Sequence, residues 1–150
     1  MNYTHQFFND YSETAHPACL QAVAYQPQQQ QIGYGLDDIS ARARDLIQAQ
    51  IHAPAAEIHF CSGGTQANLT VIGSMLRPHE AVIAVESGHI ATHETGAIEA
   101  TGHKVIHVPH VHGKLTPEAA AHALTAHPNE HSVKPRMLFI SQSTEFGTVY

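Results

Sequence analysis

The feature that most constrains the fold of this chain is a regular alternation of apolar runs and helical spacing after residue 55. Strand-like runs and segments with helical periodicity follow one another in this order: 57–62, 65–76, 80–87, 90–102, 103–110, 116–127 and 136–143. Strands that alternate with helices of this length fold through right-handed βαβ crossovers into a largely parallel sheet covered on both faces. The sequence therefore predicts the α/β class, as a three-layer α/β/α domain with a mostly parallel sheet.

The beginning of the chain lacks this alternation. A short helix is predicted before Pro27, and a second helix, capped by Asp37 or Asp38, ends before Pro54. We divide the chain into an irregular lead-in and the first part of a large domain, at 1–36 and 37–150. The chain also stops a few residues after its last predicted strand, with no helix to cover that strand. We therefore expect a truncated domain or one that depends on a partner subunit.

The composition argues against two classes of function. A formal net charge of −6 with only 7 Lys and Arg residues argues against nucleic-acid binding, because neutralising phosphates requires concentrated cations. No apolar run approaches the roughly 20 residues that cross a bilayer, and the N-terminus has neither the basic nor the apolar region of a signal peptide. We therefore expect a cytoplasmic protein that binds neither nucleic acid nor membrane.

Two glycines, Gly63 and Gly64, lie between the first predicted strand and the helix that follows it. In open parallel sheets, ligands bind beyond the carboxyl ends of the strands, where a helix N-terminus presents unpaired N–H groups and a positive dipole end. Glycines let an anion approach the backbone, Ser62 and Thr65 add hydroxyl donors, and Gln66 is within reach. This junction indicates either a phosphate site or an ordinary glycine turn. The sequence contains no G-x-x-x-x-G-K-[ST] motif that would support a P-loop.

Polar residues also follow two later strands of the predicted sheet. His89 follows the run 80–87, Glu94 lies five residues further on, and residues 141–145 read SQSTE after the last strand. Because parallel strands end at one edge of a sheet, an imidazole and a polar strand end would lie near the proposed phosphate site. This combination suggests a phosphorylated cofactor with a flat ring.

The strand–helix junctions described above belong to one longer sequence pattern. The stretch FCSGGTQANLTVIGSMLRPHEAVIAVESGHIATHETGAIEATGHKV, with FNDYSETAHP before it and ISQSTEFGTVY after it, closely resembles the N-terminal half of the threonine aldolase and β-eliminating lyase family. The resemblance implies a pyridoxal-phosphate enzyme of the aspartate aminotransferase fold, also called fold type I, of whose large domain this chain is the first part. It also implies a homo-oligomer, a dimer or a tetramer. The implied reaction on a small amino acid substrate is retro-aldol cleavage of β-hydroxy-α-amino acids to glycine and an aldehyde, or β-elimination.

The resemblance also implies roles for residues on the cofactor side of the site. Gly63, Gly64 and Thr65 would hold the phosphate of pyridoxal 5'-phosphate. His89 would stack on the pyridine ring and act near the substrate hydroxyl, where an imidazole can exchange a proton at neutral pH. Glu94 would orient or assist His89.

On the substrate side, the resemblance implies two further residues. Ser12, in NDYSE, would lie near the substrate carboxylate, and Tyr34, in the GYG turn, would approach the active site of the same or a neighbouring subunit. The segment 143–145 reads STE where many aldolases read E-N-T-H, so the sequence departs from the family pattern there.

The resemblance places two groups that define this chemistry downstream of residue 150. They are an aspartate that keeps the pyridine nitrogen protonated and a lysine that attaches the cofactor. Lys104, Lys114 and Lys134 are the only lysines, and none has the expected sequence context. We therefore expect no covalent attachment of the cofactor in this chain and no activity of the chain alone.

Three alternatives remain open. Among the 14 histidines, His110 and His112 could share a metal on one face of a strand, but no third ligand completes the set, and we expect no metal. Cys61 precedes a helix and could be a nucleophile, but its strand position favours a buried, reduced thiol, as we expect for Cys19. A half-fold could also serve as a non-catalytic interaction module or result from a disrupted reading frame.

Overall fold

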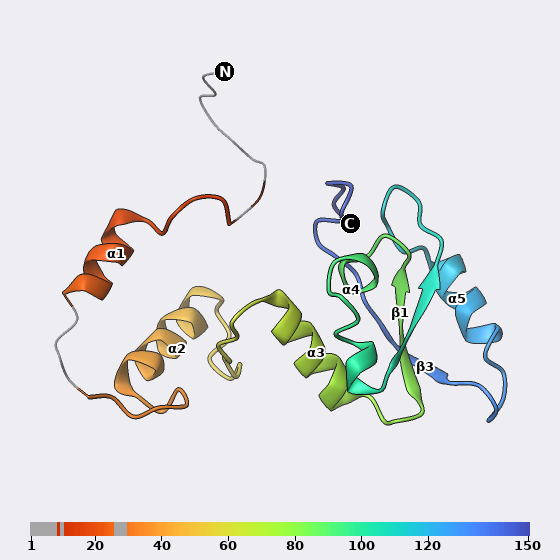
Figure 1. Cartoon of the computed structure of the whole chain (residues 1–150), viewed down its shortest axis with the longest axis horizontal. Helices are drawn as coiled ribbons and strands as arrows, with labels where there is room; N and C mark the ends of the chain where they lie inside the picture. Colours follow the sequence, from red (N-terminus) through yellow and green to blue (C-terminus); the bar gives the residue numbers. More distant parts are fainter. Residues whose placement is uncertain (1–8, 10, 26–29) are drawn as a thin grey trace, which may run out of the picture. The chain divides into compact units, whose positions relative to one another are not determined.

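The computed structural model describes residues 9, 11–25 and 30–150. The chain divides into two compact units, residues 1–58 and 59–150. The helices and strands of the described residues are, in chain order (Figure 1), α1 Pro17–Ala24, α2 Asp38–Gln50, α3 Gly64–Met75, β1 Glu80–Val85, α4 His89–Thr92, the 3-10 helix η1 Glu99–Thr101, β2 Lys104–Val108, α5 Pro117–Thr125 and β3 Lys134–Leu138. The predicted division at residue 36 rests partly on residues outside the described set, and it stays a prediction.

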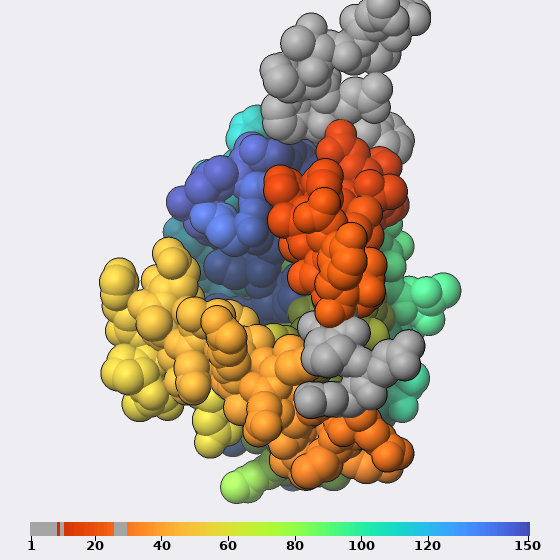
Figure 2. Space-filling model, turned by 90° about the vertical axis from the view of Figure 1, so that its left-hand side faces the viewer, coloured from red at the N-terminus to blue at the C-terminus, as the bar shows by residue number. Residues whose placement is uncertain are grey.

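The first unit contains α1 and α2, and both helices begin at capping side chains. The His16 ring accepts a hydrogen bond from the Ala18 N–H at 3.2 Å, and Pro17 occupies the first helical turn. Asp37 accepts from both the backbone N–H and the hydroxyl of Ser40, at 2.8 and 2.7 Å. These two bonds, the hydroxyl bond first, lower the pKa of Asp37. Neither helix contains a buried residue. Figure 2 draws the atoms of these two helices in red to yellow-orange.

The second unit is built on a parallel sheet with the strand order β2-β1-β3. On one side of β1, Ala81 pairs with Lys104 and Val85 with Val108. On the other side, Glu80 pairs with Lys134, and the register shifts between Ala81 and Val82. Every residue of β1 after the first is buried, as expected for a central strand that reads as an uninterrupted apolar run. The predicted parallel sheet is confirmed.

Helices cover both faces of this sheet (Figure 1). On one face, a core cluster joins Ile72 of α3, its C-cap residue Leu76, Ile90 of α4 and Ile98 to alternate residues of β1 and β2. On the other face, Ala123 of α5 packs against the remaining residues of β1 and β2. Because side chains alternate along a strand, the central strand contributes to both clusters. The three-layer arrangement is thus present, and it places α3 and α4 on the same side of the sheet.

The predicted strand at 57–62 is wrong. Among the described residues the sheet has three strands, and none of them pairs with this segment. A strand needs a neighbour to satisfy its backbone N–H and C=O groups, and an apolar alternation does not supply one. The segment is largely exposed, including Phe60, and the thiols of Cys61 and Cys19 are exposed rather than buried.

The predicted helix at 90–102 is interrupted. It forms only as two short pieces, α4 and η1. Between these pieces, Thr95 and Gly96 take left-handed backbone conformations, with φ of 54° and 76°, and these conformations interrupt the helix. Gly102 ends this region with φ of 87°, as a C-terminal glycine does. The last strand is also shorter than the predicted 136–143: β3 ends at Leu138, and the Phe139 N–H still donates to Ile83 O at 2.8 Å.

Candidate active site

The N-terminus of α3 lies at the carboxyl edge of the sheet, because α3 runs antiparallel to β1, which follows it (Figure 1). Gly63 is the N-cap residue, so no side chain satisfies the first N–H groups of this helix. A methyl group built on Gly63 or Gly64 would meet no protein atom within 4 Å. The free donors therefore face open space, which suits an anion that approaches the backbone.

A side-chain bridge organises the loop in front of α3. The Gln66 side-chain oxygen accepts from the Ser62 N–H at 2.6 Å and from the Ser62 hydroxyl at 3.0 Å. Gln66, in the first turn of α3, thus reaches back to the residue before the N-cap, one position beyond the bond of a capping box. The Ser62 hydroxyl, predicted to donate to a phosphate, is thus engaged by Gln66. Thr65 remains in the first turn of α3, next to the free N–H groups.

His89 begins α4, and residues 86–88 separate it from the carboxyl end of β1. Gly88 precedes it as the N-cap residue, and the imidazole keeps 43% of its surface exposed. The His93 ring lies beside it at a centroid separation of 5.5 Å. The His89 ring is therefore accessible at the same sheet edge as the N-terminus of α3.

The buried side chain of Glu94 contacts the ring of His89. The Glu94 side chain has no exposed surface, and its Oε1 lies 2.7 Å from His89 Nδ1. The same oxygen accepts a second bond, from Asn68 Nδ2 of α3 at 2.6 Å. The other oxygen, Oε2, is buried with no partner among the described residues, as is the hydroxyl of Ser87. The buried carboxylate thus connects α3 to the accessible imidazole through a single oxygen.

Asn68 is the residue of this group that sequence reasoning missed. Its position in the interior of a helix was the available signal, since asparagine favours caps and turns over helix interiors. Its partner lies 26 positions away along the chain. Only the packing of α3 and α4 on one sheet face brings the two together.

Two of the predicted substrate residues lie in the other compact unit. Ser12 is an exposed residue before α1, and Tyr34 is exposed with a left-handed φ of 64°. Their roles at the active site stay predictions.

The polar segment after β3 is occupied by its own contacts. The hydroxyls of Thr144 and Thr148 are 2.7 Å apart, and Thr144 is buried. The Ser141 hydroxyl donates to Glu145 at 3.2 Å, while the Thr148 hydroxyl donates to His112 O at 2.7 Å. These groups tie the end of the chain to the loop after β2.

His110 and His112, the pair that could share a metal, lie in the loop after β2. His110 Nδ1 accepts from the Gly113 N–H at 3.0 Å, and its ring lies 4.9 Å from that of Phe146. His112 lies in a left-handed turn with φ of 51°. Within residues 9, 11–25 and 30–150, no three His, Cys, Asp or Glu side chains gather as a metal site. No helix in this part of the chain has both the length and the apolar character needed to cross a membrane.

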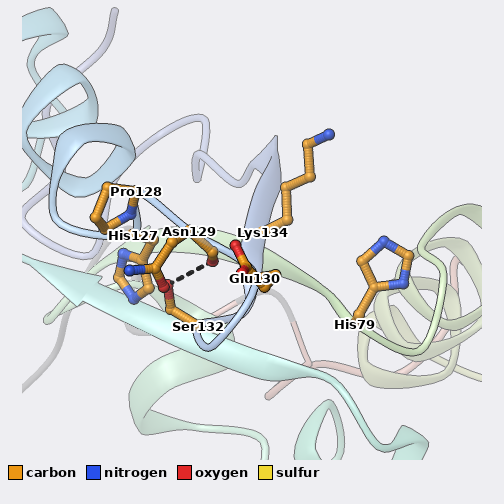
Figure 3. A pocket seen from close by; sticks show the side chains of 7 residues that line it. All are labelled: His79, His127, Pro128, Asn129, Glu130, Ser132 and Lys134. Carbon is orange, nitrogen blue, oxygen red and sulfur yellow. Dashed lines mark hydrogen bonds between the residues drawn. The ribbon is translucent and has the colours of Figure 1, made fainter.

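A polar hollow of about 610 Å³ lies at the opposite, amino edge of the sheet. His79, His127, Asn129 and Lys134 are among its lining residues, and Figure 3 shows the Lys134 amine extended away from His127 and Asn129. Its polar groups do not converge on one point.

The same edge carries Glu80. Its pKa is lowered, first by a hydrogen bond from the Arg77 N–H and then by the charge of Arg136 nearby. This bond and this ion pair join the start of β1 to the turn after α3 and to β3, so they serve the fold.

The fold and the site together define a parallel α/β protein with an uncapped helix N-terminus and, at the same sheet edge, a buried carboxylate in contact with an accessible imidazole. The family model for β-eliminating lyases matches residues 11–150. A low specificity L-threonine aldolase from Pseudomonas aeruginosa is 32% identical over 99% of this chain and 43% of its own length. A second, from another Pseudomonas strain, is 34% identical over 78% of this chain and 34% of its own length.

A solved structure agrees with these relatives. The threonine aldolase of Leishmania major has a TM-score of 0.90 and 49% sequence identity over 95% of this chain and 42% of its own chain. The chain therefore belongs to the β-eliminating lyase family, as its sequence pattern predicts. It spans less than half the length of these threonine aldolases.

Proposed function

We propose that this chain forms the phosphate-binding and ring-stacking part of a pyridoxal-phosphate-dependent lyase. The substrates are β-hydroxy-α-amino acids, which are cleaved to glycine and an aldehyde, with β-elimination as the related reaction. The names of the relatives support the aldol reaction, since both sequence relatives are low specificity L-threonine aldolases. The observation that carries the proposal is the uncapped N-terminus of α3 at the same sheet edge as the imidazole of His89.

The residues present fit a phosphorylated, aromatic cofactor. Gly63 and Gly64 leave open space in front of free N–H groups, and Thr65 adds a hydroxyl. A phosphate held there accepts several hydrogen bonds from the helix N-terminus. The exposed ring of His89 supplies a flat surface for the pyridine. When bound, pyridoxal 5'-phosphate supplies an electron sink for the bond that breaks.

His89 and Glu94 are the residues that move and hold the proton. Glu94 Oε1, buried and 2.7 Å from Nδ1, keeps a proton on that ring nitrogen. The Nε2 atom is then left with its lone pair and can accept the proton of a substrate hydroxyl. Ser12 and Tyr34 are proposed to complete the site on the substrate side, within a homodimer or homotetramer.

The lysine that attaches the cofactor is proposed to be none of the three in this chain. Lys104 and Lys134 begin β2 and β3, opposite Ala81 and Glu80 of β1. In a parallel sheet these positions lie at the amino edge, away from the N-terminus of α3. Lys114 lies over the Tyr150 ring at 5.7 Å. We therefore propose that the cofactor is not covalently attached to this chain and that the chain is inactive alone. We also propose that the protein is cytoplasmic.

Equilibrium titration with pyridoxal 5'-phosphate and with pyridoxal, followed by tryptic mapping after borohydride reduction, tests this proposal. The phosphorylated form is expected to bind at least about tenfold more tightly, since charged hydrogen bonds contribute about 1.5–3 kcal/mol each. Gly64→Ala is expected to abolish that preference, and Gly102→Ala, just before β2 at the amino edge of the sheet, to retain it. Equal binding of the two compounds, or a stoichiometric adduct on Lys104 or Lys134, would refute the proposal. Equal binding would favour the alternative that the chain is a non-catalytic interaction module.

A further inference from the structure

We propose that Asn68 is a positioning residue that sets the tautomer of His89 through Glu94. Asn68 lies one turn into α3, and its amide donates to Glu94 Oε1 at 2.6 Å. His89 Nδ1 lies 2.7 Å from the same oxygen. The functional meaning of this arrangement rests on the proposed function, whereas the hydrogen-bond chain is a property of the folded chain.

The chemistry of the three groups restricts where the protons lie. A side-chain amide nitrogen can only donate, so Glu94 Oε1 must accept from Asn68. An oxygen that carries a carboxyl proton is a poorer acceptor than a carboxylate oxygen, and the Asn68 bond therefore favours negative charge on Oε1. With charge there, the proton between Glu94 and His89 belongs to Nδ1. The lone pair is then left on Nε2.

Because Glu94 is buried, its carboxylate depends on the hydrogen bond from Asn68 to stabilise its charge. Oε2 has no hydrogen-bond partner among the described residues, and the side chain has no exposed surface. Among the described residues, the donors to the carboxylate are thus Asn68 and His89, and both lie at Oε1. A buried carboxylate that loses one of two donors takes up a proton more readily. The Glu94 hydroxyl would then donate to His89 Nδ1, and the ring proton would move to Nε2.

The competing role for Asn68 is purely structural, as a polar tie between α3 and α4. The two roles predict different spectra. A structural tie affects the stability of the chain and leaves the His89 tautomer in the folded state unchanged. A positioning role changes the ratio of the Nδ1–H and Nε2–H forms at constant fold.

The test is the ¹⁵N spectrum of the His89 ring in the chain without cofactor, recorded well above the ordinary imidazole pKa of about 6.5. The wild-type ring is expected to be mainly the Nδ1–H form. Asn68→Leu keeps the size of the side chain and removes its donor, and it is expected to shift the tautomer ratio at least about tenfold toward Nε2–H. Thr70→Leu, at an exposed position of the same helix, is the matched control and is expected to keep the wild-type ratio.

Either of two results overturns the proposal: a wild-type ring mainly in the Nε2–H form, or a wild-type ratio in folded Asn68→Leu. Asn68→Ala, which removes the amide without adding apolar bulk, replaces the leucine variant if that one does not fold. Failure of both variants to fold would identify Asn68 as a structural tie between α3 and α4 and would also overturn the proposal. Because the spectrum is recorded without cofactor, its outcome is separate from that of the pyridoxal-phosphate titration.

Discussion

Replacing Gly113 with alanine tests how the end of the chain is fixed to the sheet. Gly113 has a φ of 79°, and an added Cβ would lie 2.7 Å from Thr144 Oγ1 and 2.9 Å from Phe146 Cδ2. The left-handed conformation costs a residue with a Cβ about 1–2 kcal/mol. Forcing a methyl group into a filled space costs about 1–3 kcal/mol more. Gly113→Ala should therefore destabilise the chain by about 2–5 kcal/mol.

Gly102→Ala is the matched control for this prediction. Gly102 has a φ of 87°, but an added Cβ there meets nothing within 4 Å. Its cost should be the backbone term alone, about 1–2 kcal/mol. Urea unfolding followed by far-ultraviolet circular dichroism measures both variants. Equal destabilisation would show that the contact with Thr144 and Phe146 does not constrain the loop, and the tie between the loop and the chain end would be refuted.

Three further predictions concern the core, a cap and an ion pair. Ile83→Ala, at a residue 1% exposed, should cost about 2–5 kcal/mol in denaturant unfolding, whereas the half-exposed Leu138→Ala should cost far less. Thr116→Ala removes the acceptor of the Ala119 N–H and should cost about 1 kcal/mol; an unchanged unfolding midpoint would contradict this role. Glu80 has a folded pKa below its unfolded value of 4.5, so its contribution is present above pH 4.5 and is lost as the pH falls through the lowered value. The stability difference between wild type and Glu80→Gln should therefore shrink on acidification, and a constant difference would contradict it.

Local signals in the sequence predicted several helix ends. Asp37 and Thr116 accept hydrogen bonds from the N–H groups three residues on, as their positions before apolar periodic segments indicate. Gly102 ends a helical turn in the left-handed conformation. These features depend on a few neighbouring residues, so a single sequence contains them.

Features that depend on distant partners were not predicted. The run 57–62 has a strand pattern, yet no strand of the sheet pairs with it. The turn at Thr95 and Gly96 interrupts a helix whose periodicity looked continuous. The Asn68 bond to Glu94 spans 26 positions and needs α3 and α4 on one face of the sheet. Pairing, register and cross-helix contacts are properties of the assembled unit.

The same distinction between local signals and distant partners applies to the candidate site, of which only part could be predicted. The glycines at 63 and 64 and the imidazole at 89 each follow from a local junction, and the parallel sheet brings their ends to one edge. The engagement of Ser62 by Gln66 was not predicted, because a rotamer decides it. The roles of Ser12 and Tyr34 stay predictions, since both lie in the other compact unit.

The most direct test of the cofactor site is a titration of the ¹⁵N-labelled chain with pyridoxal 5'-phosphate, with the backbone amide signals as the readout. Saturable shifts of the Gly64, Thr65 and Gln66 amides, together with the His89 ring, are the predicted result, because a phosphate at the N-terminus of α3 contacts those N–H groups. Shifts confined to the hollow around His79 and Lys134, or no saturable shift at the start of α3, would contradict the proposed site.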